Sequence, residues 1–124
     1  MTTQEIATRL VELVGKGEFQ TCYQELYSPE IISIEADGST VNGFEGIQAK
    51  GKEWNAGIET FHGSSIGEAV VSGNYFALPM SMTITYKGAT EPVKFQEICL
   101  YHVNDGKIVK EQFFYDAPTT AQSS

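Results

Sequence analysis

The first part of the chain places apolar residues three or four positions apart, the spacing of one helix face. Residues 2–14 show this spacing and predict a first helix. Thr2 and Glu5 stand where a capping box would open it. The glycines of residues 15–17 favour the left-handed backbone that ends a helix. We therefore expect the chain to begin with a well-defined amphipathic helix.

Two more helices are predicted from the same spacing. The second begins at residue 18 and is ended by Pro29, because a residue that precedes proline resists helical dihedrals. The third covers residues 44–58, with Trp54 facing a sheet. Between them, residues 31–36 alternate and predict a short strand, which an Asp-Gly pair ends in a tight turn.

After the third helix the apolar positions alternate with a period of two, which is typical of strands. We expect the first of these strands to bend at Gly67, and we expect Pro79 to need an edge or a bulge. Asn104-Asp105-Gly106 predicts a tight turn in the last strand pair. The predicted strands cover residues 61–72, 75–87 and, as a hairpin, 95–116.

This order of elements predicts an α+β domain in which the helices are separate from an antiparallel sheet. Twist should curve the long strands into a cup that the three N-terminal helices close. We find no repeat or linker and expect one domain over residues 1–124, with an ordered core of about residues 3–117. The small polar residues from Thr119 onward should fray.

Both faces of the predicted hairpin are apolar, whereas a sheet with one wet face alternates cleanly. We therefore expect one face to lie under the helices and the other against a second copy of the chain. The alternative is a small apolar cluster under a loop. The expected inner row is Phe95, Glu97, Cys99, Tyr101 and Val103, and the expected outer row is Ile98, Leu100 and His102.

Composition narrows the classes of partner. The 124 residues are 41% hydrophobic and 19% charged, as in an ordinary globular protein. The net charge of −8 argues against nucleic acids and anionic membranes, which need a basic face. Cys22 and Cys99 lie in apolar patterns and are expected to be buried thiols in a reducing compartment. The chain shows no signal peptide and no apolar run of about 20 residues, so we expect a cytoplasmic protein.

Two segments carry a family resemblance, namely residues 43–47 (GFEGI) and residues 104–109 (NDGKIV). They resemble the nuclear transport factor 2-like superfamily, and within it the SnoaL-like polyketide cyclase and ketosteroid isomerase branch. The resemblance extends over residues 3–116. It implies a cone-shaped, cystatin-like sheet around three helices, an apolar pocket at the open end and dimers through the outer sheet face. The superfamily includes both enzymes and binding or assembly modules, so the fold alone does not decide the activity.

The resemblance also suggests a catalytic carboxylate. In the ketosteroid isomerase branch, a carboxylate on the first strand after the second helix moves a proton beside a carbonyl, and Glu35 lies at or near that position. The alternative is a solvated glutamate before a turn. The branch's oxyanion-hole acid and tyrosine correspond to Cys99 and Leu10, so this sequence departs from the branch there.

Glu97 stands in an apolar row, where a carboxylate needs a partner or an unusual pKa. It is either a pocket acid or base near Glu35, or a salt-bridged or exposed strand residue. Glu111 is expected to form a surface pair with Lys94 or Lys110.

Aromatic residues could line the pocket. Tyr101 and Tyr115 could donate to a ligand carbonyl or be core residues with a wet tip, and Trp54 could be core or pocket wall. His62 and His102 lack metal-ligand spacing, and no phosphate or dinucleotide motif occurs, so we expect no metal and no cofactor. The expected ligand-contacting residues are Tyr23, Trp54, Phe95, Cys99, Tyr101 and Tyr115.

Two functions remain open from the sequence. The first is a cofactor-free isomerase, cyclase or hydratase that acts on an apolar carbonyl compound, with Glu35 and Glu97 as acid–base candidates. The second is a non-catalytic dimeric module of the same fold that binds a ligand or supports assembly.

Overall fold

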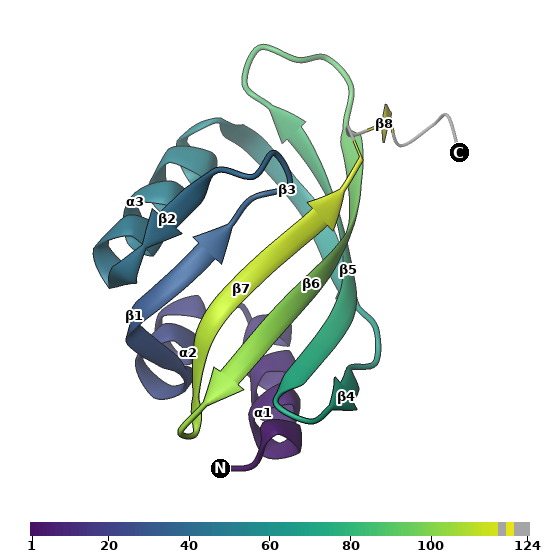
Figure 1. Ribbon diagram of the computed structural model, residues 1–124. Helices are drawn as coiled ribbons and strands as arrows, with labels where there is room; N and C mark the ends of the chain where they lie inside the picture. Colours follow the sequence, from purple (N-terminus) through teal and green to yellow (C-terminus); the bar gives the residue numbers. More distant parts are fainter. Residues whose placement is uncertain (117–118, 121–124) are drawn as a thin grey trace.

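The computed structural model describes residues 1–116 and 119–120, and its elements follow in the order shown in Figure 1. The helices are α1 (Thr3–Gly15), α2 (Phe19–Leu26) and α3 (Gly43–Ala56). The strands are β1 (Tyr27–Ile34), β2 (Thr40–Asn42), β3 (Ile58–Ile66), β4 (Val70–Ser72), β5 (Tyr75–Tyr86), β6 (Val93–Asn104), β7 (Lys107–Tyr115) and β8 (Thr119–Thr120).

The capping box and the hairpin turn form as predicted. Thr2 and Glu5 form both bonds of the capping box, at 3.1 and 2.8 Å. The turn between β6 and β7 has positive φ at Asp105 (50°) and Gly106 (74°), as a tight hairpin turn requires. Fraying is not seen at Thr119–Thr120, which pair with β6, and the expected end of the core at residue 117 lies outside the described residues.

The second helix ends earlier than predicted. It stops at Leu26, and Tyr27 is already a strand residue that pairs with Ile108 of β7. Pro29 lies inside β1, two positions after the strand begins. Tyr27, which the sequence places within the second helix, is therefore the C-cap of α2 and the first residue of β1.

The strands form one curved sheet in the order β2-β1-β7-β6-β5-β3 (Figure 1). In addition, β4 pairs with β5 and β8 pairs with β6. The α+β class is confirmed. The sheet is mixed rather than wholly antiparallel, because β1 pairs with β7 in parallel. The chain between these two strands passes through α3 and most of the sheet, which supplies the long connection that a parallel pair needs.

An interruption at Gly67 divides the strand predicted over residues 61–72 into β3 and β4. Gly67 N donates to Pro79 O at 2.8 Å, and a Cβ on Gly67 would lie 2.5 Å from Pro79 Cγ. The nitrogen of Pro79 is on the same side of β5 as its carbonyl, so the missing N–H faces the interruption. The expected bend at Gly67 and the bulge required by Pro79 are therefore the same feature.

Helices α1 and α2 close one end of the sheet. Apolar side chains of both helices, among them Leu10 and Leu26, are buried in one cluster with Phe76 and Leu78 of β5. Trp54 of α3 is not part of this cluster. Trp54 is 38% exposed and is therefore not a core residue. Cys22 and Cys99 are buried free thiols, as predicted.

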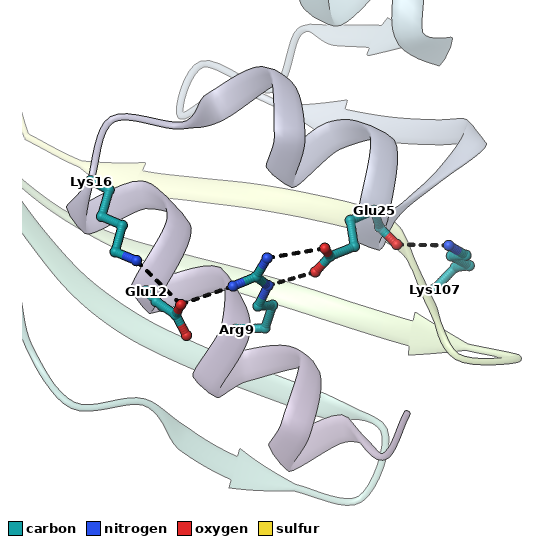
Figure 2. Close-up of polar contacts among 5 residues, drawn as sticks. All are labelled: Arg9, Glu12, Lys16, Glu25 and Lys107. Atoms are coloured by element: carbon teal, nitrogen blue, oxygen red, sulfur yellow. Dashed lines mark hydrogen bonds and ion pairs between the residues drawn. The ribbon is translucent and has the colours of Figure 1, made fainter.

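A polar clamp fixes the closed end (Figure 2). The Arg9 guanidinium on α1 contacts both carboxylate oxygens of Glu25 on α2, at 2.7 and 3.1 Å, and Glu12 Oε1 at 2.9 Å. Lys107, just after the β6–β7 turn, donates to the Glu25 carbonyl oxygen at 2.7 Å. The clamp joins both helices to the β6–β7 turn (Figure 2).

Candidate functional site

The inner face of the sheet becomes less buried with distance from the β6–β7 turn. Along β6, Tyr101 and Cys99 are buried, whereas Glu97 and Phe95 are only partly buried. On β7, the partly buried Phe113 and the exposed Tyr115 follow the same trend. We call this open inner end of the sheet the cup; its residues are Met80, Phe95, Glu97, Phe113 and Tyr115, with Glu35 and Lys50 beside them.

Glu97 is the partly buried carboxylate of the cup. The Cys99 thiol donates to its Oε1 at 3.6 Å, and the described residues form no salt bridge with it. Burial raises the pKa of the Glu97 carboxyl, and the charges of Glu35 and Glu111 raise it further, whereas the Cys99 bond and Lys50 lower it. Glu97 therefore accepts a proton more readily than an ordinary glutamate does.

Glu35 is paired with Lys50 of α3 and is not a free base. The two side chains are 24% and 29% exposed, so water partly screens the pair. Lys50 Nζ also donates to Ser33 Oγ at 2.9 Å and lies 4.8 Å from the ring centroid of Phe113. Lys50 is thereby placed at the side of the cup, a position that the sequence did not reveal.

Glu35 and Glu97 share the inner face but do not touch. Ser33 of β1 pairs with Glu111 of β7, and Phe113 of β7 pairs with Cys99 of β6. Following this register, Glu35 and Glu97 are separated by the width of β7, or roughly 10 Å between backbones at two strand spacings.

Glu111 is buried, which contradicts the expected surface pair with Lys94 or Lys110. Its side chain is 4% exposed and accepts bonds from the Tyr27 hydroxyl and from Ser33 Oγ, the second at 2.8 Å. Burial raises the pKa of its carboxyl, although these two bonds and Lys50 lower it. The alternation of β7 places Glu111 on the same face as Tyr115, the inner face. The sequence pattern, however, predicts its partner Tyr27 within the second helix.

Three of the six expected ligand-contacting residues lie at the cup or beside it. Phe95 packs edge-to-face against Tyr115 with ring centroids 5.8 Å apart, and against Tyr86 at 6.3 Å. Cys99 is buried directly under Glu97, and its Sγ lies 3.3 Å from Met80 Sδ. Burial raises the pKa of the Cys99 thiol, which stays protonated and can donate.

The other three expected ligand-contacting residues lie outside the cup. Tyr101 is buried and stacks on Phe76 with ring centroids 4.7 Å apart. Tyr23 of α2 packs edge-to-face against Tyr27 at 5.0 Å. Trp54 is exposed on α3. Tyr101 and Tyr23 thus belong to the closed part of the cone, so a ligand in the cup would not meet them without movement.

A family model described as a SnoaL-like domain matches residues 1–115. The chain belongs to the SnoaL-like domain family. A crystal structure of a proposed SnoaL-like polyketide cyclase from Mesorhizobium loti is 33% identical to this SnoaL-like chain. It covers 93% of this chain and 100% of its own, with a TM-score of 0.85. No curated protein matches.

Two more distant structures share the fold of this SnoaL-like domain. A protein from Catenulispora acidiphila with a ketosteroid isomerase-like fold, in complex with trimethylamine, is 23% identical over 93% of this chain and 88% of its own, with a TM-score of 0.73. A cystatin-like protein from Xanthomonas campestris is 23% identical over 94% of this chain and 92% of its own, with a TM-score of 0.76. The expected superfamily and cone fold are therefore confirmed.

The SnoaL-like domain also has a hollow of about 730 Å³, on the outer face of the sheet. Pro79, Ile98 and Phe114 line it, and they are direct neighbours across β5, β6 and β7. These residues alternate with the inner row, and Ile98 and Phe114 are 46% and 47% exposed. Met80, Glu97 and Tyr115 of the cup also line this hollow, so the hollow and the cup share one edge of the sheet.

The cup offers acid–base groups and one cation. The described residues contain no cluster of three or more His, Cys, Asp or Glu side chains that could hold a metal ion. None of the helices in the described part is long and apolar enough to cross a membrane. The chemistry that the SnoaL-like cup can support with its own side chains is proton transfer by Glu97 beside the Lys50 ammonium.

Proposed function

We propose that this SnoaL-like domain is a cofactor-independent enzyme that moves a proton next to a carbonyl group of an apolar small molecule, as isomerases and cyclases do. The observation that carries the proposal is Glu97. It is a partly buried carboxyl with a raised pKa at the open end of an aromatic-lined cup, and the Cys99 thiol is its hydrogen-bond partner among the described residues.

In this reaction Glu97 takes a proton from the carbon beside the ligand carbonyl. The C–H bond breaks, its electron pair moves toward the carbonyl oxygen, and an enolate forms. Return of the proton to another carbon gives an isomer, whereas attack of the enolate carbon on a second carbonyl closes a ring. A raised pKa favours this role because a carboxylate closer in pKa to the working pH is a stronger base.

The negative charge on the enolate oxygen needs a donor. Lys50 can supply it, since its ammonium acts electrostatically on Glu97 and lies over the ring of Phe113, next to the cup. The ion pair with Glu35 keeps that ammonium on the inner face. We thus assign Glu35 the role of anchoring Lys50 and Glu97 the role of proton acceptor. The 33% identity to a proposed polyketide cyclase supports a substrate with more than one carbonyl group.

A non-catalytic binding or assembly module is the second candidate. It is favoured by the hollow on the outer face and by the exposed Ile98 and Phe114 within it. A module of this kind would bind its partner without any contribution from Glu97.

The test is hydrogen exchange at carbon. Apolar ketones such as 2-tetralone are incubated with the protein in D2O, and loss of the α-proton signal is followed by NMR. We expect the wild type to accelerate exchange and Glu97→Gln to lower the acceleration by roughly 10²- to 10⁴-fold, as for loss of a general base. Glu91→Gln, in an exposed loop, is the control and should exchange like the wild type. Binding without accelerated exchange across a panel of ketones would favour the second candidate.

A further inference from the structure

A buried serine connects Lys50 to Glu111. Ser33 is fully buried, accepts from Lys50 Nζ at 2.9 Å and lies 2.8 Å from Glu111 Oε2. A lysine ammonium can only donate, so the single hydroxyl proton of Ser33 must point to Glu111. Both hydrogen bonds therefore donate in the same direction, from Lys50 to Ser33 and from Ser33 to Glu111.

Glu111 is held from two sides. The Tyr27 hydroxyl donates to one carboxylate oxygen and Ser33 donates to the other. The described residues form no direct ion pair with it, and the cation that lowers its pKa is Lys50, one hydroxyl away. A buried carboxylate costs free energy, which the bonds from Tyr27 and Ser33 offset in part.

We propose that Glu111 is a positioning residue, which holds the Lys50 ammonium at the side of the cup through the Ser33 hydroxyl. Lys50 is then fixed by two acceptors, Glu35 at the solvent side and Ser33 at the core side. The contact with Glu35 is partly exposed and can exchange for water, whereas the Ser33 contact cannot. The consequence for catalysis rests on the proposed function; the placement of Lys50 does not.

Glu111→Gln disrupts this chain without removing its shape. Glutamine carries no charge. With its oxygen toward Tyr27, its amide leaves Ser33 facing two donors, and with its oxygen toward Ser33, the acceptor is neutral and holds the Ser33 proton more weakly. Ser33→Ala removes the link directly. Tyr27→Phe is the matched control, because it removes a bond to the same buried carboxylate and leaves the branch to Lys50 intact.

The readout is hydrogen exchange of the Lys50 ammonium, followed in ¹H–¹⁵N spectra of ¹⁵N-lysine protein and assigned with Lys50→Arg. No substrate is required, so the result is independent of whether the proposed function holds. We expect exchange to be roughly fivefold faster in Ser33→Ala and Glu111→Gln, the factor that corresponds to a hydrogen bond of about 1 kcal/mol. Tyr27→Phe should exchange like the wild type.

Glu35→Gln covers the case in which the buried variants fail to fold, because this side chain is partly exposed. If the Ser33 branch holds Lys50, the Lys50 signal persists in Glu35→Gln. Loss of that signal, or equal exchange rates in the wild type, Ser33→Ala and Glu111→Gln, would overturn the proposal. If Lys50 behaves as expected but Glu97→Gln leaves ketone exchange unchanged, the proposed function fails while the placement of Lys50 by Glu111 stands.

Discussion

Ser33 and Glu111 are joined twice, by a side-chain hydrogen bond of 2.8 Å and by direct pairing of β1 with β7. Their parallel register places both side chains on the inner face at the same height. The register therefore brings a buried acid under the helix that carries Lys50. The buried acid in this link is the basis of the first prediction.

The first prediction concerns the pH dependence of stability. Burial raises the pKa of Glu111 above the ordinary glutamate value of 4.5, so the folded state binds the proton more tightly than the unfolded state. The stabilisation by this proton is complete below pH 4.5 and is lost as the pH rises through the folded-state value. The glutamine of Glu111→Gln does not titrate, so this variant does not lose stability in this way. The free energy of unfolding of Glu111→Gln should therefore increase relative to the wild type between pH 4 and pH 7.

Denaturant unfolding at both pH values measures this difference, and Glu91→Gln controls for the loss of a surface carboxyl. A difference between the wild type and Glu111→Gln that stays constant or shrinks toward pH 7 would show that ionisation of Glu111 does not oppose folding.

The second prediction concerns the charges around Glu97. Lys50 lowers the pKa of the Glu97 carboxyl and Glu35 raises it. Lys50→Met should therefore raise the Glu97 pKa, and Glu35→Gln should lower it. Titration of the Glu97 side-chain carbon signal by ¹³C NMR measures both changes. Lys52→Met, an exposed lysine on the same helix, is the matched control and should leave the titration unchanged.

Features that depend on neighbouring residues could be predicted from the sequence. The Thr2–Glu5 capping box and the turn at Asp105-Gly106 require only residues a few positions apart, and both form as expected. The alternation of the strands also fixed which residues share a face, so Glu97, Cys99 and Tyr101 were placed correctly on the inner row.

The contacts that define the site could not be predicted in this way. Tyr27 and Glu111 are 84 positions apart, and they meet because β1 and β7 pair in parallel, an arrangement with no local sequence pattern. The sequence pattern of β7 therefore does not predict that Glu111 is buried. Lys50 was missed because a lysine on a helix resembles any surface lysine until the helix is placed against the sheet.

The third prediction concerns a second copy of the chain. We propose that the outer sheet face forms a homodimer, because Ile98 and Phe114 are exposed side by side on paired strands. Ile98→Lys or Phe114→Lys should convert the dimer to a monomer without loss of secondary structure, because an unpaired charge cannot be buried in the dimer interface. Light scattering during gel filtration gives the mass, and Trp54→Lys, on a helix, is the control. A wild-type protein that is monomeric at high concentration would contradict the proposal.

The last prediction compares two glycines. At Gly67 an added Cβ would lie 2.5 Å from Pro79 Cγ, a ring atom that cannot rotate away, so Gly67→Ala should destabilise the protein by about 1–3 kcal/mol. Gly51, in the interior of α3, has open space around its Cβ position. Gly51→Ala should therefore stabilise the fold by about 1 kcal/mol, the difference in helix propensity. Urea unfolding of both variants measures the two effects. If Gly67→Ala is as stable as the wild type, the interruption between β3 and β4 does not depend on the close approach of Gly67 to Pro79.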